Sequence, residues 1–188
     1  MTLWLARHAE VLCPPGLCYG STDWPADADA TVRAAAVLAR ELPAGTTVAV
    51  SPLARCQQLA EALHPLRPEL ARGTDARLRE MHFGAWEGRP WRDIARPEFD
   101  AWMADFAHAR PGGDGETVAE LMARVAAAWD QAQASAQPVA WITHAGVMRA
   151  ARLLARGVRQ PARAADWPAD ALPMGGVWVL GPGAPRFL

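Results

Sequence analysis

Two apolar runs, far apart in the chain, each end on a histidine. The first run, residues 3–6, is followed by Arg7 and His8, and the second, residues 139–143, is followed by His144. Apolar runs of this length are typical of buried strands. Ligands of open α/β sheets bind at the carboxyl ends of the strands. The pattern therefore predicts two strands that bring two imidazoles to one edge of a sheet.

Between and after these runs, strand-like and helix-like segments alternate. Ser51 and Pro52 predict the start of one helix, because Ser is a favoured N-cap and Pro a favoured first helical residue. Helices are expected at 28–42, 52–63, 116–134 and 146–156, and extended segments at 46–50, 71–80 and 176–180, the last strand. This alternation predicts an α/β fold with a mainly parallel sheet.

The chain has 188 residues and no internal repeat or interdomain linker, which predicts a single domain over residues 1–188. One stretch, at about residues 81–111, does not fit the alternation of strand and helix. It holds three tryptophans, Trp86, Trp91 and Trp102, and predicts an inserted flap of short helices. Tryptophans are core residues by default, but in a flap they can also face a flat aromatic ligand.

Composition excludes several classes of function. The net charge is −1 and the pI about 6.5, which gives no support for nucleic-acid or membrane binding. All 19 basic residues are arginines, so chemistry that needs a Schiff-base or phosphate-loop lysine is excluded. There is no spanning apolar run and no signal peptide, and the three cysteines form no paired framework, so we expect a cytoplasmic protein with reduced thiols. The oligomeric state is left open, with a homodimer as one alternative.

Five polar side chains are expected at strand ends or helix starts: Arg7, His8, Arg55, Glu80 and His144. Arginine suits bidentate recognition of phosphate oxygens, and a helix N-terminus adds further donors. A neutral imidazole is a competent nucleophile, and a carboxylic acid can protonate a leaving alkoxide. Together they predict a dianion site that takes a phosphoryl group. Taken singly, each of these residues is more often structural or solvated.

Four segments carry a resemblance to a known family. They are Arg7-His8-Ala9-Glu10, the segment 51–60 beginning Ser-Pro-Leu-Ala-Arg, the segment 78–88 that contains Glu80, and Thr143-His144-Ala145-Gly146. In order and content they resemble the histidine phosphatase superfamily, with the phosphoglycerate-mutase-like fold. Ala9 and Ala145 stand where the family has glycines, Leu59 where it has threonine, and His82 where an acidic residue is expected.

This resemblance implies a fold, an activity and residue roles. The fold would be a three-layer sandwich, and the activity would proceed without metal or other cofactor. His8 would become phosphorylated, while Arg7, Arg55 and His144 would hold the phosphoryl oxygens. Glu80 would donate a proton to the leaving group and then activate water. The partner would be a small phosphorylated metabolite.

Within the family, the segment 18–25 resembles α-ribazole phosphatases of cobalamin synthesis. We therefore expect Ser21 and Thr22 in this segment, and Trp86 in the flap, to contribute to substrate binding. Two alternatives stay open: a broad-specificity small-molecule phosphatase, and a phosphotransferase of the phosphoglycerate mutase type. A non-catalytic scaffold on the same fold is disfavoured, because the full set of reactive residues is present.

Overall fold

The computed structural model describes residues 2–170, 172–181 and 186–187. Its centre is one six-stranded sheet in the order β3-β2-β4-β1-β5-β6. The parallel strands are β1 (Leu3–Arg7), β2 (Thr47–Val50), β3 (Arg72–Thr74) and β4 (Val139–Thr143), and β5 (Val177–Leu180) and β6 (Arg186–Phe187) run antiparallel to their neighbours. The predicted α/β fold with a mainly parallel sheet is confirmed. The last strand is β6, however, which the sequence analysis did not predict.

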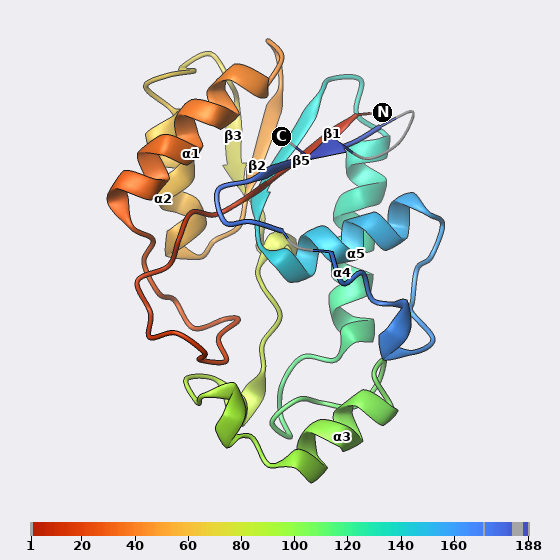
Figure 1. The fold of residues 1–188 in the computed structure, drawn as a ribbon. Helices are drawn as coiled ribbons and strands as arrows, with labels where there is room; N and C mark the ends of the chain where they lie inside the picture. The colour runs from red at the N-terminus through yellow and green to blue at the C-terminus, as the bar shows by residue number, and fades with distance from the viewer. Residues whose placement is uncertain (1, 171, 182–185, 188) are drawn as a thin grey trace.

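Helices cover both faces of this sheet (Figure 1). On one face, α1 (Ala28–Glu41) and α2 (Ala54–Leu63) pack through Leu38 and Leu59 against Val48 and Val50. On the other, α4 (Val118–Gln133) and α5 (Ala145–Ala155) pack against the opposite side of the sheet. Because β4 is buried on both faces, all five of its residues are buried, which explains its unbroken apolar run.

The start of α2 differs from the prediction. The N-cap is Leu53, not Ser51, and the first helical residue is Ala54. The physical reason is that the Ser51 hydroxyl lies 2.7 Å from Nε2 of His144, in a buried contact across the sheet. The segment 71–80 also differs, since only β3 is extended. Asp75 accepts a hydrogen bond from the Arg77 backbone N–H and caps a short 3-10 helix, η1 (Ala76–Leu78).

The segment 81–111 contains the short helices η2 (Gly84–Trp86), η3 (Trp91–Asp93) and α3 (Arg96–Ala104). Figure 1 shows these green elements beyond the end of the sheet where β1 and β4 finish. An isolated bridge joins Leu17 to Pro90, and the Cys18 N–H donates to Arg89 O at 2.8 Å. The loop after β1 is thereby attached to this segment.

Candidate active site

The two histidines lie side by side because their strands are neighbours. β1 and β4 pair in parallel, with Arg7 opposite Thr143, so His8 and His144 follow at matching positions. Their ring centroids are 5.1 Å apart and the rings are tilted by 54°. The prediction of paired imidazoles at one edge of the sheet is confirmed.

His8 is held as a neutral imidazole with one free nitrogen. Its Nδ1 lies 2.8 Å from the carbonyl oxygen of Ala9, and a carbonyl only accepts, so Nδ1 carries the proton. The side chain is buried, and this burial, with the nearby charges of Arg55 and Arg7, lowers the pKa of His8 to about 3. Nε2 therefore keeps its lone pair at neutral pH.

His144 has both ring nitrogens engaged by protein groups. Arg55 Nε donates to Nδ1 at 3.2 Å, because a guanidinium has no acceptor. Nε2 must then carry the proton, which it donates to Ser51 Oγ at 2.7 Å. Complete burial, followed by the proximity of His8 and Arg55, holds the pKa of His144 well below its usual value. On this geometry His144 orients Arg55, and contact with a ligand would require it to exchange a hydrogen bond.

Arg55, in the first turn of α2, is fully buried, yet it lines a cavity. Nη1 donates to Thr22 O at 2.9 Å and Nη2 donates to Gly20 O at 2.6 Å. With the bond to His144, three of the five N–H groups of the guanidinium are bound. The carbonyls fix the plane of the guanidinium and leave two donors for an anion.

Glu80 reaches the same place from the segment after η1. The Thr143 hydroxyl donates to Leu78 O at 2.7 Å and fixes that segment against β4. The Glu80 carboxylate accepts from Met81 N and from Gly146 N, each at 3.0 Å. A Cβ at Gly146 would lie only 2.3 Å from Glu80 Oε1, so the absence of a side chain there lets the carboxylate sit against the start of α5.

Two arginines near Glu80 each have a buried Nε without a hydrogen-bond partner among the described residues: Arg7 and Arg149. Nη1 of Arg7 donates to Leu172 O. Burial lowers the pKa of Arg7, the Glu80 carboxylate opposes that shift, and the Arg149 charge adds to it. Arg149 therefore stands close enough to contribute to the positive field of the site. Arg149 was not predicted from the sequence as a site residue.

A cavity of about 520 Å³ connects these groups. Its polar wall contains Arg7, His8, Arg55, Glu80 and Arg149, and its aromatic wall contains Tyr19, Phe83, Trp91, Trp102, Phe106 and Trp167. His144 is not on the wall, although its neighbours Ala145 and Gly146 are. Helical spacing from these two residues is the signal that would have found Arg149, one turn further along α5.

Besides His144, three residues that were expected at the substrate do not line this cavity: Ser21, Thr22 and Trp86. Ser21 and Thr22 hydrogen-bond instead to the Glu87 carboxylate, through their backbone N–H groups at 3.0 and 3.1 Å. Trp86 is only 2% exposed and donates from Nε1 to Glu98 Oε2 at 2.9 Å. It packs in an aromatic cluster inside the 81–111 segment. Trp91 and Trp102 do line the cavity, as expected of flap tryptophans.

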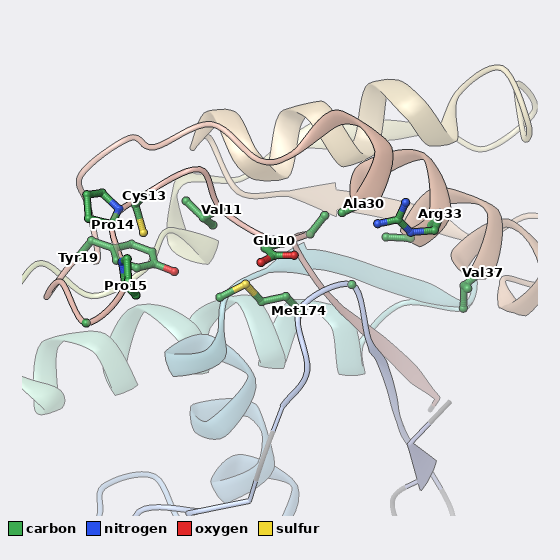
Figure 2. Close-up of a pocket in the computed structure, with 14 residues that line it drawn as sticks. Glu10, Val11, Cys13, Pro14, Pro15, Tyr19, Ala30, Arg33, Val37 and Met174 are labelled. Atoms are coloured by element: carbon green, nitrogen blue, oxygen red, sulfur yellow. The ribbon is translucent and has the colours of Figure 1, made fainter.

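A second cavity, of about 580 Å³, lies behind the loop after β1 and is shown in Figure 2. Glu10 and Met174 lie near its middle, with Arg33 of α1 on one side and Cys13 and Tyr19 on the other. Tyr19 is shared with the first cavity, but no imidazole lines the second one. The reactive groups therefore belong to the smaller cavity.

The described residues contain no cluster of three or more His, Cys, Asp or Glu placed to hold a metal ion. In that same part of the chain, every helix is too short or too polar to span a bilayer.

The arrangement of paired imidazoles, arginines and a carboxylate at the end of a parallel sheet agrees with comparison to known proteins. Residues 3–170 match the histidine phosphatase superfamily (branch 1). The chain belongs to this superfamily, whose named relatives include a phosphatase.

The individual relatives differ in the activities for which they are named. A probable phosphoglycerate mutase, GpmB, of Yersinia enterocolitica is 33% identical over 135 residues, 69% of this chain and 62% of that relative. The match thus spans less than two thirds of the length of that relative. The adenosylcobalamin/alpha-ribazole phosphatase of Escherichia coli K12 is 30% identical over 175 residues, 87% of this chain and 82% of that relative.

Among solved structures, a mycobacterial glucosyl-3-phosphoglycerate phosphatase in complex with VO3 superposes with a TM-score of 0.79. It is 27% identical, and the alignment covers 100% of this chain and 96% of that chain.

Proposed function

We propose that the protein is a metal-independent phosphomonoesterase that works through a phosphohistidine. His8 Nε2 attacks phosphorus as the ester oxygen leaves, and Glu80 gives that oxygen its proton. The Glu80 carboxylate then takes a proton from water, which attacks the phosphohistidine and releases inorganic phosphate. Arg7 and Arg55 hold the phosphoryl oxygens throughout, with His144 behind Arg55.

The observation that carries this proposal is the protonation state of His8. A proton fixed on Nδ1 by the Ala9 carbonyl leaves Nε2 with a free lone pair, and the buried ring belongs to a residue that lines the cavity. Burial is the main cause of the lowered pKa of His8, and Arg55 and Arg7 lower it further. The two arginines also supply positive charge where the transferred phosphoryl group would develop negative charge. Burial and the arginines together therefore keep the nucleophile neutral, and the arginines attract its substrate.

We propose a substrate whose leaving group bears a flat aromatic ring, with α-ribazole 5′-phosphate as the specific candidate and α-ribazole as the group that leaves. The aromatic wall of the cavity, which includes Phe83, Trp91 and Trp102, supports a ring-bearing leaving group. The Escherichia coli relative, named for alpha-ribazole, supports the same choice. A phosphotransferase of the phosphoglycerate mutase type is the second candidate, favoured by the Yersinia relative, and a broad-specificity phosphatase is the third.

Rapid quenching tests the mechanism. Wild type mixed with p-nitrophenyl phosphate should yield an acid-labile, base-stable phosphoenzyme at His8, and His8→Ala should lose both phosphoenzyme and turnover while melting as a folded protein. Activity should persist in EDTA, because the arginines supply the positive field. Turnover by His8→Ala, or EDTA inactivation reversed by a divalent ion, would overturn the mechanism. Exchange of phosphate between two sugar acids would instead identify the phosphotransferase.

A further inference from the structure

The carboxylate of Glu87 is surrounded by hydrogen-bond donors, most of which come from residues 20–22 in the loop after β1. Its oxygens accept from the backbone N–H groups of Gly20, Ser21 and Thr22 at 3.0 to 3.1 Å. They also accept from Phe83 N at 3.0 Å and from the Thr22 hydroxyl. Burial alone would raise the pKa of Glu87, but these donors lower it below its ordinary value. The group is therefore a fixed anion at neutral pH.

The same loop contacts the candidate active site through its carbonyl groups. The oxygens of Gly20 and Thr22 accept from Nη2 and Nη1 of Arg55, at 2.6 and 2.9 Å. Residues 20–22 thus present N–H groups to Glu87 and carbonyl groups to Arg55. The fit is close, since a Cβ at Gly20 would lie 1.8 Å from Met81 O.

We propose that Glu87 is a positioning residue for the phosphate-binding guanidinium of Arg55, acting through residues 20–22. The proposal rests on the proposed function, which makes Arg55 a ligand of the phosphoryl group. The Ser21 hydroxyl also donates to the carboxylate, at 3.4 Å. Without the carboxylate, six donors lose their acceptor, and nothing then holds residues 20–22 in the conformation that places both carbonyls on the guanidinium. Glu87 follows directly after η2, so the 81–111 segment and the phosphate site share one hydrogen-bonded connection.

Binding of inorganic phosphate, measured by calorimetry, tests this without any turnover. Glu87→Gln keeps the shape but turns one acceptor into a donor that faces N–H groups. We expect phosphate to bind roughly tenfold more weakly, the cost of about one hydrogen bond to a charged group. Asp114→Asn is the matched control, because Asp114 also accepts a backbone N–H, from Ala85 at 3.0 Å, but among the described residues it accepts no hydrogen bond from residues 20–22. It should bind phosphate like wild type.

A double-mutant cycle with Arg55→Lys separates positioning from general support. If Glu87 acts through Arg55, Glu87→Gln should cost little further affinity in the Arg55→Lys background. Additive losses, or wild-type affinity in Glu87→Gln, would overturn the inference. If Glu87→Gln does not fold, Thr22→Val decides in the same cycle, since it removes only the hydroxyl donated to Glu87 and keeps the carbonyl bound to Arg55. Failure of wild type itself to bind phosphate would count against the proposed function instead.

Discussion

The arginines of this site favour a ligand that carries negative charge. Arg7 and Arg149 each hold a buried Nε without a protein partner among the described residues, and both line the cavity with Glu80. A buried donor without an acceptor costs free energy, and a buried charge costs more. An anionic ligand removes that cost, so the folded protein carries a penalty that binding relieves.

At this scale we predict that Arg149→Gln raises the KM for p-nitrophenyl phosphate by roughly tenfold, the loss of about one charge-assisted hydrogen bond. Arg156→Gln is the control from the same helix, because Arg156 is an exposed arginine at the C-cap of α5. Steady-state kinetics of both variants checks the prediction. Equal KM values for the two variants would show that Arg149 does not contact the anion.

Among the elements, the 81–111 segment combines a packed interior with a cavity wall. Trp86 is enclosed by Trp91, Phe99 and Trp102, at centroid distances of 5.8 to 6.5 Å. Trp91 is 39% exposed and lines the cavity. The two tryptophans are near in sequence, but of the two only Trp91 lines the cavity, so their truncation should have different consequences.

Trp86→Ala should lower the free energy of unfolding by about 3–5 kcal/mol, because it leaves a large hole in a buried cluster. Trp91→Ala should change stability much less and raise the KM of an aromatic nucleoside-like phosphate more than that of an alkyl phosphate. Denaturant melts and the ratio of the two KM values provide the measurements. If folded Trp91→Ala keeps the wild-type ratio, the 81–111 segment does not select the leaving group.

For the whole molecule, the buried imidazoles link folding to pH. Burial, then the charges of Arg55 and Arg7, lower the pKa of His8 from 6.5 to about 3. Between these pH values the unfolded chain binds a proton at His8 and the folded chain does not. The stability that this contributes is fully present above about pH 6.5 and is lost progressively as the pH falls toward 3. His144, with a pKa also well below its usual value, acts in the same direction.

We therefore predict that wild type loses stability between about pH 7 and pH 5. His8→Asn should lose less over this interval, by up to about 2 kcal/mol, because it has no imidazole to titrate at that position. Urea melts of both proteins at the two pH values measure the difference. Parallel losses in the two proteins would mean that His8 is not held neutral by the fold.

Local patterns in the sequence were enough to predict the sheet and much of the site. Apolar runs and helical stripes mark most elements because burial on one face or two imposes a period on the chain. The predicted polar residues, among them Arg7, His8 and Glu80, follow directly from the ends of such elements. The strand β6 was missed, and the start of α2 was placed too early.

Only the tertiary structure decided which polar groups line the cavity and which hydrogen-bond to each other. Ser21 and Thr22 bind Glu87, and His144 binds Arg55 and Ser51, across separations of 65 to 93 residues along the chain. A hydrogen-bond donor gives the same signal in a sequence whether it binds a substrate or a distant carboxylate. The choice depends on packing between remote segments, and this is also why Trp86 is buried while Trp91 lines the cavity.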